Sequence, residues 1–416
     1  MIVTTDRGNT MTAAAPARHP DQPCRIPKGI EIFSRLLRID PPTDAEFARL
    51  GSALMEGDPA MDAVVDAMSA AGMRETRPLF EKALADGIDS VAGAPAAMEQ
   101  FFRDAERTPD WVDRDQLVLA AQVMQSGGTD GLYIARDVAL MGGYLFSGFN
   151  QTLLRTGALK KGSNKRFAET SRWALDVISA GGLEVGGAGY RSTIRVRFIH
   201  SMVRRHVGGM ADWDDDLFGV PVNQTDMAAT LVGSLVAPSV GVAGLGLVNS
   251  PREYEAVAHL TRYVGWLIGV DDEFLPRDFR DAIRILAHTS AALSTPDETS
   301  RQLAMPMFDD PDEWHYDTFP RFRRALARSQ HMGIAFAFLG PGALRKLGFS
   351  GVAVPWYPPM VIGLNVARSL AAQLPGGRAR AARSGERRAE SFMTTMAPVP
   401  VVVGDSAAAV NAHAHA

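Results

Sequence analysis

The sequence predicts an all-α fold built as a single large helical domain, and three observations support this prediction. Apolar residues recur three and four positions apart in one segment after another, which is the spacing of one helical face. Pro, Thr, Ser or Asn stands at the start of several of these segments, where such residues cap helices. Strand-like alternation of apolar and polar residues is scarce along the 416 residues. With 46% hydrophobic residues, the chain is long enough to bury a sizeable core.

In the first third of the chain, residues 1–25 are expected to be disordered, and the helical domain is expected to cover residues 26–374. Helices are expected to begin at Pro42 and Thr43 and to cover Asp58–Ala71, Ala96–Asp104 and Arg114–Ser126. The Gly127–Gly128 pair is expected to break the last of these before a second long helix that runs to Met141.

The rest of the chain continues the helical pattern, with helices expected after Asn223 and over Pro251–Gly269, Phe279–Leu293, Phe319–His331 and Pro341–Leu347. Two apolar runs, Leu235–Val248 and Val352–Val366, are interrupted by glycines or prolines, so neither is a clean membrane span of about 20 residues. We expect both runs to be buried core segments and expect no transmembrane segment. Residues 375–416 are rich in arginine and then in alanine, which predicts a solvated, flexible tail.

The charge balance and the cysteine content exclude several classes of protein. The chain carries 43 basic and 47 acidic residues, a net charge of −4, whereas nucleic-acid binders usually present a dominant basic surface. Its one cysteine, Cys24, allows no intramolecular disulfide and no cluster of thiolate ligands. The first 28 residues contain no apolar stretch of the kind found in secretory signals. We therefore expect a cytoplasmic protein without a nucleic-acid partner.

The most informative stretch runs from Met141 to Val207, where two helical segments are separated by a glycine-rich loop. In the second segment, Arg197, His200 and Arg204 are three and four residues apart and therefore share one helical face. A neutral imidazole can ligate a metal through one ring nitrogen, and a guanidinium group binds carboxylates in a bidentate manner. Haem offers an iron and two carboxylates, so this pattern fits a haem site. A hydrogen-bonded core histidine beside a solvated basic face would produce the same pattern.

The first of the two helical segments carries a second polar group of residues. Arg166, Thr170 and Trp173 form one stripe, and Glu169 stands three residues after Arg166. A guanidinium, a hydroxyl, a carboxylate and a large ring on adjoining faces could line the polar distal side of a haem pocket. An amphipathic helix with a surface pair between Arg166 and Glu169, worth less than about 1 kcal/mol, explains the same residues.

The sequence from Pro109 to Pro276 resembles the oxygenase family that includes the bacterial latex-clearing proteins and the fungal MpaB enzyme. The resemblance rests on the segments TPDWVD, MGGYLFSGFNQTLLRTGAL, KRFAETSRW, RVRFIHSMVRRH, PVNQTDM and GWLIGVDDEFLP, in this order. It implies an all-α protein with a globin-like helical core around haem b, which is iron protoporphyrin IX. In such a site His200 would be the proximal iron ligand, with Arg197 and Arg204 nearby.

On the distal side, the resemblance implies that Arg166 and Thr170 donate hydrogen bonds to bound oxygen, with Trp173 and Asn150 beside the cofactor. Two positions differ from what we expect in the rubber-cleaving branch of the family. Glu169 stands where a lysine is expected, and Asn150 stands where a carboxylate is expected. Together with the missing export signal, these differences argue against cleavage of rubber, which is a solid extracellular polymer.

The function expected from this resemblance is that of a haem-dependent, dioxygenase-type oxygenase. Ferrous haem held by His200 would bind O2 as co-substrate, and the oxygen would attack a C=C bond of a hydrophobic small molecule such as an isoprenoid. Glu169 could act as a general base for an allylic proton of that substrate. Two alternatives remain open: a haem-binding or gas-sensing protein without catalysis, and a hydrophobic-ligand protein without haem. The sequence does not indicate whether the protein forms an oligomer.

Overall fold

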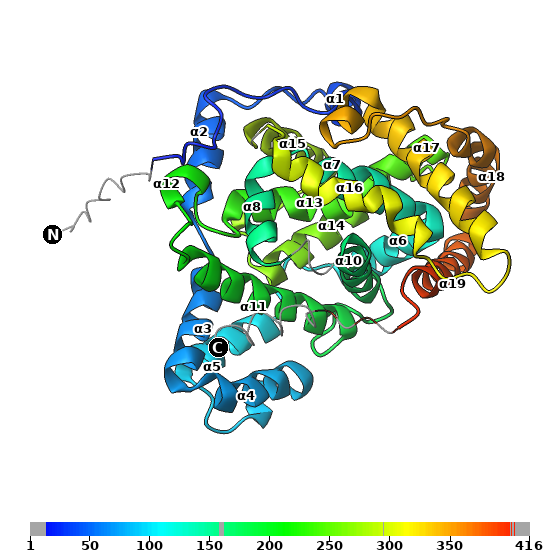
Figure 1. Cartoon of the computed structure of the whole chain (residues 1–416). Coiled ribbons are helices and arrows are strands. Elements are labelled where there is room, and N and C mark those ends of the chain that lie inside the picture. Colours follow the sequence, from blue (N-terminus) through cyan, green and yellow to red (C-terminus); the bar gives the residue numbers. More distant parts are fainter. Residues whose placement is uncertain (1–13, 158–161, 294, 400, 402, 404–416) are drawn as a thin grey trace.

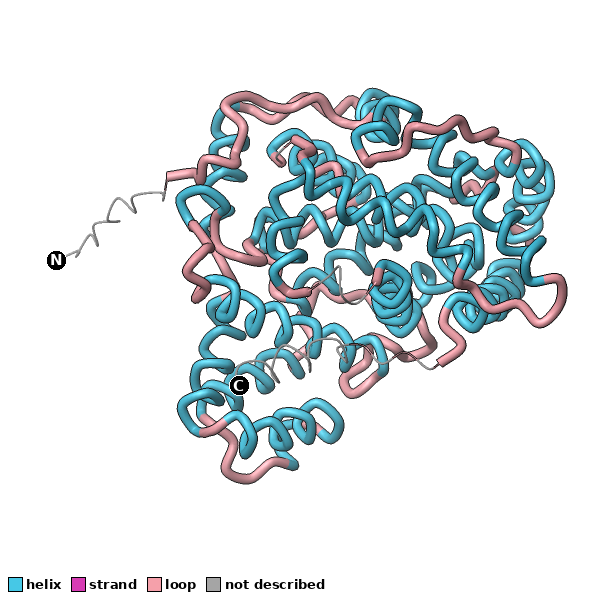
Figure 2. The backbone as a smooth tube through the Cα atoms, viewed as in Figure 1, coloured by secondary structure: helices cyan, strands magenta, loops and turns pink. Residues whose placement is uncertain are grey.

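The computed structural model describes residues 14–157, 162–293, 295–399, 401 and 403, and within these ranges the regular elements are helices without any β-strand. Figure 2 shows this helical architecture. The predicted all-α fold is therefore confirmed. Helices α13 and α14 occupy the middle of the molecule, and the other long helices surround them (Figure 1).

The N-terminal region consists of short helices with well-defined starts. Thr43 begins α2 through a capping box with Glu46, and Asp58 caps α3, where Pro59 occupies the first helical position. Both starts agree with the prediction. The elements of this region are α1 (Lys28–Leu36), α2 (Asp44–Ser52), η1 (Ala53–Met55), α3 (Pro59–Ala71), α4 (Met73–Asp86), η2 (Ile88–Ser90) and α5 (Ala96–Glu106).

The central region contains the helices that carry the candidate site residues. Its elements are α6 (Arg114–Ile134), the π-helical segment η3 (Ala135–Leu140), α7 (Met141–Gly143), α8 (Ser147–Arg155), α10 (Ser163–Val177), α11 (Ala188–Gly208), α12 (Asp215–Phe218), α13 (Gln224–Gly241), η4 (Val242–Leu245), α14 (Pro251–Ile268) and η5 (Asp272–Phe274). The expected break at Gly127–Gly128 appears as a kink inside α6, where Gly128 has a φ of +52°. The two predicted helical segments of the central stretch correspond to α10 and α11.

Helix α11 is anchored by its buried side. Phe198 packs against Phe80 of α4, with ring centroids 4.6 Å apart, and Ile194 is fully buried. Burial of each such side chain contributes about 1.5 to 3 kcal/mol to stability. The position of α11 is therefore set by the main hydrophobic core and by the helices α3, α4, α10 and α14 that pack against it.

The C-terminal region completes the domain with α15 (Phe279–Ala292), α16 (Glu298–Asp309), η6 (Asp310–Asp312), α17 (Pro320–Lys346), α18 (Tyr357–Ala372) and α19 (Gly377–Met396). Helix α19 contradicts the predicted flexible tail of residues 375–416, because it packs along α6 and buries side chains such as Phe392. Gly385 permits this close approach, since a Cβ atom there would lie 1.9 Å from the carbonyl oxygen of Gln125. The helical domain therefore extends beyond residue 374, to Met396.

The N-terminal segment also differs from its prediction. Disorder was expected over residues 1–25. Residues 14–25 instead lie against the helices, and Arg18 forms an ion pair with Asp226 of α13 at 2.6 Å. Both side chains are almost completely buried, so this contact fixes the segment to the core. Residues 1–13 lie outside the described residues.

The two apolar runs have different environments. Leu235–Val248 is mostly buried, as expected. Gln224–Leu245, which includes most of it, is long and apolar enough to cross a membrane by length and composition, but 56% of its most apolar window is buried inside the protein. Val352–Val366 was expected to be buried and is not: most of its side chains are exposed. The reason is that α18 lies at the surface and turns only Pro358, Asn365 and Ala372 fully inward.

Candidate functional site

Helix α11 has a partly open apolar face beside its buried side. Val196, Ile199 and Val203 are half-buried, and His200 lies among them. These positions are three and four residues apart, so their side chains form one continuous stripe along the helix. None of the four is fully buried, although Val196 also packs against the main hydrophobic core, so the stripe keeps some accessible surface.

His200 has the properties of a neutral metal ligand. Burial and the nearby positive charge of Arg204 lower its pKa to about 4, against the opposite effect of Asp58, so its imidazole is uncharged at neutral pH. Its Nδ1 atom is buried and has no hydrogen-bond partner among the described residues. Part of the side-chain surface is nevertheless accessible. An uncharged imidazole with an unpartnered ring nitrogen and some accessible surface is a residue that could hold a haem iron.

Arg197 binds a carboxylate of the protein itself. Its Nε and Nη2 atoms donate to the two carboxylate oxygens of Asp58 at 2.6 and 2.8 Å, and Nη1 donates to the backbone oxygen of Leu267 at 3.2 Å. The side chain is only 13% exposed. The expectation that Arg197 holds a carboxylate of haem is therefore not supported by this geometry. Its donors are used where α11 meets the start of α3 and the end of α14.

Arg204 is also held by the protein, but it keeps one donor in reserve. Its Nε atom donates to Asp62 at 2.9 Å, and Nη1 donates to the backbone oxygen of Val222 at 2.5 Å. Ser201 donates to the same carboxylate of Asp62 at 2.5 Å and so fixes its position. The Nη2 atom of Arg204 is buried and has no hydrogen-bond partner in the described ranges. Of the two arginines, Arg204 is therefore the one that retains a buried donor for a ligand.

Trp173 joins α10 to α11. Its indole Nε1 donates to the hydroxyl oxygen of Thr193 at 3.0 Å, and both side chains are buried. The ring belongs to the main hydrophobic core. The sequence-based hypothesis of a ring beside the cofactor is thus replaced by a packing role, in which Trp173 sets the spacing of the two helices.

Replacing Trp173 with Phe should lower the free energy of unfolding by about 1 to 3 kcal/mol, because it removes a buried hydrogen bond and leaves unfilled volume. Urea denaturation measures this change. The matched control is Trp356→Phe, which removes an indole hydrogen bond to the exposed Ser329 and should cost much less. Equal losses for the two variants would show that the contact with Thr193 does not stabilise the α10–α11 pair.

The Trp173–Thr193 contact also fixes the arrangement of the other candidate residues. Arg166 lies seven residues before Trp173, and His200 lies seven residues after Thr193. Seven residues are about two helical turns, so each shares the face of its partner in that contact. Figure 1 shows α10 nearly end-on and α11 lengthwise, so the two helices cross rather than run parallel. Arg166 therefore lies on the side of α10, and His200 on the side of α11, that makes this contact.

The remaining polar residues of α10 stand close to Arg166. The guanidinium carbon of Arg166 lies 6.0 Å from the ring centre of Tyr144, and its side chain is half-buried. Thr170 is exposed, and its hydroxyl donates to the backbone oxygen of Arg166 at 3.1 Å. Glu169 is half-buried. Helix α10 therefore presents these three side chains together, while Trp173 points into the core.

Asn150 connects α8 to its surroundings. Its amide Nδ2 donates to the backbone oxygen of Tyr144 at 3.0 Å and to the hydroxyl of Thr299 at 3.2 Å. The side chain is fully buried, and its Oδ1 atom has no hydrogen-bond partner among the residues described. Asn150 thus holds α8 against α16 and still offers one acceptor. Because Arg166 lies over Tyr144, Asn150 is only indirectly linked to the face that carries Arg166.

The chain matches a known family over most of this region. The family described as "ER-bound oxygenase mpaB/B'/Rubber oxygenase, catalytic domain" matches residues 132–371. The chain belongs to this family. The match contains every candidate residue of α8, α10 and α11, and it ends before α19.

Two relatives illustrate how close the likeness is. A rubber oxygenase from Streptomyces sp. (strain K30) is 24% identical over 251 residues, which cover 56% of this chain and 59% of that protein. The solved structure of a latex clearing protein in the closed state has a TM-score of 0.50 and 20% identity, and the likeness covers 84% of this chain and 86% of that one. The structure supports the helical fold. The match with the rubber oxygenase spans less than two thirds of that protein's length.

A buried ionic cluster, which begins near the start of the region that matches the family, was not predicted from the sequence. Arg136 of η3 donates to Asp137 at 2.7 Å and to Asp310 at 2.9 Å. His331 contacts the second oxygen of Asp137 at 2.5 Å, and Ser163 donates to Asp310 at 2.5 Å. All five side chains are buried. Since Ser163 is the first residue of α10, this cluster fixes the start of the helix that carries Arg166. The sequence did contain a sign of this cluster, because the charged residues Arg136 and Asp137 stand within an otherwise apolar helical stretch.

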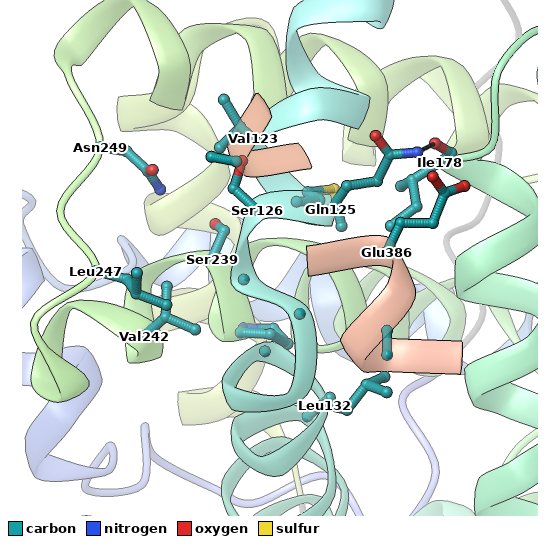
Figure 3. Close-up of a pocket in the computed structure, with 18 of the residues that line it drawn as sticks. Val123, Gln125, Ser126, Leu132, Ile178, Ser239, Val242, Leu247, Asn249 and Glu386 are labelled. Atoms are coloured by element: carbon teal, nitrogen blue, oxygen red, sulfur yellow. Dashed lines mark hydrogen bonds between the residues drawn. The ribbon is translucent and has the colours of Figure 1, made fainter. Parts of the chain in front are cut away.

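An apolar pocket lies beside these helices, between α6, α13, α18 and α19 (Figure 3). Its walls are mainly apolar, and the polar groups Ser126, Ser239, Asn249 and Glu386 are distributed around it. Gln125 donates to the backbone oxygen of Ile178 at 2.8 Å and so links α6 to the residue that follows α10. The pocket therefore adjoins α10. It could not be predicted from the sequence, because its α19 wall was assigned to a tail.

Proposed function

We propose that this family member is a haem b-dependent oxygenase of the dioxygenase type that acts on a C=C bond of a hydrophobic small molecule such as an isoprenoid. Membership of an oxygenase family supports the oxygenase part of this proposal. The haem part rests on one observation: His200 is deep and uncharged, has an unpartnered ring nitrogen and lies in a partly open apolar stripe. The relation to a protein named rubber oxygenase supports an apolar, alkene-containing substrate class.

The residues of α11 would hold the haem. His200 would be the protein ligand of its iron, because the Nδ1 atom of His200 is buried and has no hydrogen-bond partner among the described residues. Val196, Ile199 and Val203 would contact the flat macrocycle and keep water away. The unpartnered Nη2 of Arg204 would donate to a propionate group. When bound, haem would supply an iron that binds O2 and activates it towards an alkene.

The polar residues of α10 would act on the reactants. The guanidinium of Arg166 donates hydrogen bonds, and the hydroxyl of Thr170 can rotate away from its helix carbonyl to donate as well. Once the cofactor and the substrate cover them, such donors would stabilise negative charge that develops on the reactants. A carboxylate oxygen of Glu169 would accept an allylic proton from the substrate and return it before the carbonyl products leave. Trp173 would keep α10 at the required distance from α11.

The proposed substrate is a small molecule in the cytoplasm rather than solid rubber. Glu169 and Asn150 occupy positions where we expect a lysine and a carboxylate in the rubber-cleaving branch, so the polar groups near the reacting bond differ. The pocket of Figure 3 has mainly apolar walls and is lined by Ala174 and Leu175 of α10, although its lining does not include Arg166, Glu169, Thr170 or His200. We propose that it accommodates the hydrocarbon part of the substrate, because burial of apolar surface is the main driving force for binding such a chain.

The test uses purified protein supplied with haem. Its absorption spectrum is recorded without oxygen before and after reduction with dithionite, and turnover of an isoprenoid alkene such as squalene is measured in air after the dithionite has been removed. We expect a Soret absorption band that shifts on reduction, and oxygen-dependent conversion of the alkene into carbonyl products. A Soret band without conversion of squalene or shorter isoprenoids would identify a haem carrier or gas sensor. A protein that stays colourless after haem is supplied would refute the haem assignment.

A further inference from the structure

The C-terminal part of the helical domain has a one-sided charge distribution. The whole chain carries 47 acidic residues against 43 basic ones, yet the segment from residue 318 to residue 385 contains no Asp or Glu. Its basic residues are Arg321, Arg323, Arg324, Arg328, Arg345, Lys346, Arg368, Arg378, Arg380 and Arg383. A block of one sign in a chain that is otherwise acidic indicates a surface that faces a negatively charged partner.

Most of these basic side chains are not neutralised by carboxylates from other parts of the fold. Arg328 pairs with Asp309 and Asp312, and Arg378 pairs with Glu253. In the portion of the chain that the structure describes, the other basic residues of the segment form no ion pair. Six of them are exposed: Arg321, Arg323, Arg345, Lys346, Arg380 and Arg383. Their positive charge is therefore available to a partner.

The same segment exposes an apolar surface. Met360, Leu364, Leu370 and Leu374, along α18 and just after it, are between 55% and 72% exposed. Their spacing places them on one side of the helix. Of the nineteen large hydrophobic side chains exposed within the described ranges, eleven lie between Phe319 and Leu374. Isolated exposed apolar residues are normal, whereas a concentration of this kind marks an interaction site.

The apolar and basic residues are carried by helices that lie next to one another. Helices α17, α18 and α19 are grouped together in Figure 1, and α18 packs against both of the others. The indole Nε1 of Trp356, directly before α18, donates to Ser329 of α17 at 3.1 Å. Ser329 follows the exposed Phe322 by about two helical turns and therefore shares its face. The apolar surface thus continues from the start of α17 onto α18.

We propose that this surface, formed by α18, the start of α17 and the basic residues of α19, docks the protein on an anionic lipid bilayer. A surface helix with an apolar face and flanking Arg or Lys residues inserts into the interface of such a bilayer. Pairing of two copies through this face would bring unpaired arginines together, and like-charge repulsion opposes that arrangement. A nucleic acid would leave the apolar side chains in water. The inference does not depend on the proposed function.

Vesicle sedimentation with the full chain tests this assignment. We expect binding to phosphatidylcholine vesicles that contain phosphatidylserine, a loss of binding as salt rises, and weak binding to pure phosphatidylcholine. The variant with Met360→Ser, Leu364→Ser and Leu370→Ser should bind the anionic vesicles at least about tenfold less tightly. A separate variant with Arg380→Glu and Arg383→Glu should lose a similar factor, because it reverses the charge beside the apolar face.

The matched control replaces Ile32 and Leu36 of α1 with Ser. These two side chains are 64% and 72% exposed, which is similar to the residues changed on α18, but they lie outside the basic segment. The control should bind vesicles as the wild type does, and circular dichroism should show the same helix content for all variants. Absence of binding to anionic vesicles, or equal binding by every variant, would overturn the proposal. A dimer in sedimentation velocity that the α18 substitutions abolish, without vesicle binding, would assign the face to a second copy instead.

Discussion

Replacing His200 with Ala is expected to remove haem from the protein and to reduce oxygenase activity by more than about 100-fold. The loss should exceed the 10- to 100-fold effect of mutating groups that merely support a ligand, because the ligand itself is removed. The substitution deletes a side chain whose unpartnered nitrogen is already buried, so it breaks no hydrogen bond of that atom. Haem content is measured from the Soret absorption of protein reconstituted with excess haem, and activity from oxygen uptake with squalene.

Two companion variants separate loss of a ligand from loss of structure. His206→Ala changes the same residue type on the same helix, also at a half-buried position, and should keep its haem. His200→Gly should regain the Soret band when free imidazole is added, since the small molecule can occupy the place of the side chain. His200→Ala protein that retains its full haem content and turnover would show that another residue binds the iron.

Several features could be predicted from the sequence because their causes are local. Thr43 and Asp58 start helices through hydrogen bonds to amides within the same first turn, so no distant partner is needed. The face shared by Arg197, His200 and Arg204 follows from the helical period alone. The kink of α6 likewise follows from a glycine that adopts a positive φ.

The partners of the site residues could not be predicted, because they depend on tertiary contacts. Asp58 lies 139 residues from Arg197 in the chain, and no spacing pattern reports which carboxylate a guanidinium will meet. The prediction placed Arg197 on the same face as His200 and then assigned its donors to a ligand. The same limitation applies to Trp173, whose indole N–H is used by Thr193 in the core.

Helices α18 and α19 show a related limitation. The apolar run Val352–Val366 suggested a core, and the arginines after residue 375 suggested a solvated tail, but composition alone does not say whether a neighbour is available to cover a side chain. A signal for α19 was present nevertheless. Ala382, Gly385 and Ala389 are three and four residues apart and form the small-residue face that lies against α6.

Replacing Arg136 with Met should lower the free energy of unfolding by about 3 to 5 kcal/mol, the largest stability effect that we expect from a single substitution in this chain. Arg136 is 1% exposed and bonds to the carboxylates of Asp137 and Asp310. Met has a similar volume, so the main change is electrostatic: two buried carboxylates lose the cation between them. Urea denaturation followed by circular dichroism measures the loss. Haem content should also fall, because Asp310 holds Ser163 at the start of α10.

The control for this effect is Arg328→Met, which removes an arginine of α17 that pairs with Asp309 and Asp312 next to the same turn. Arg328 is 48% exposed, so water compensates its carboxylate partners, and its removal should cost less than about 1 kcal/mol. If Arg136→Met fails to fold, Asp310→Asn supplies a milder test, since it keeps the shape of the side chain and one acceptor oxygen. Similar losses for Arg136→Met and Arg328→Met would mean that burial does not determine how much the cluster contributes to the free energy of unfolding. In that case the cluster would not be what holds the start of α10 in place.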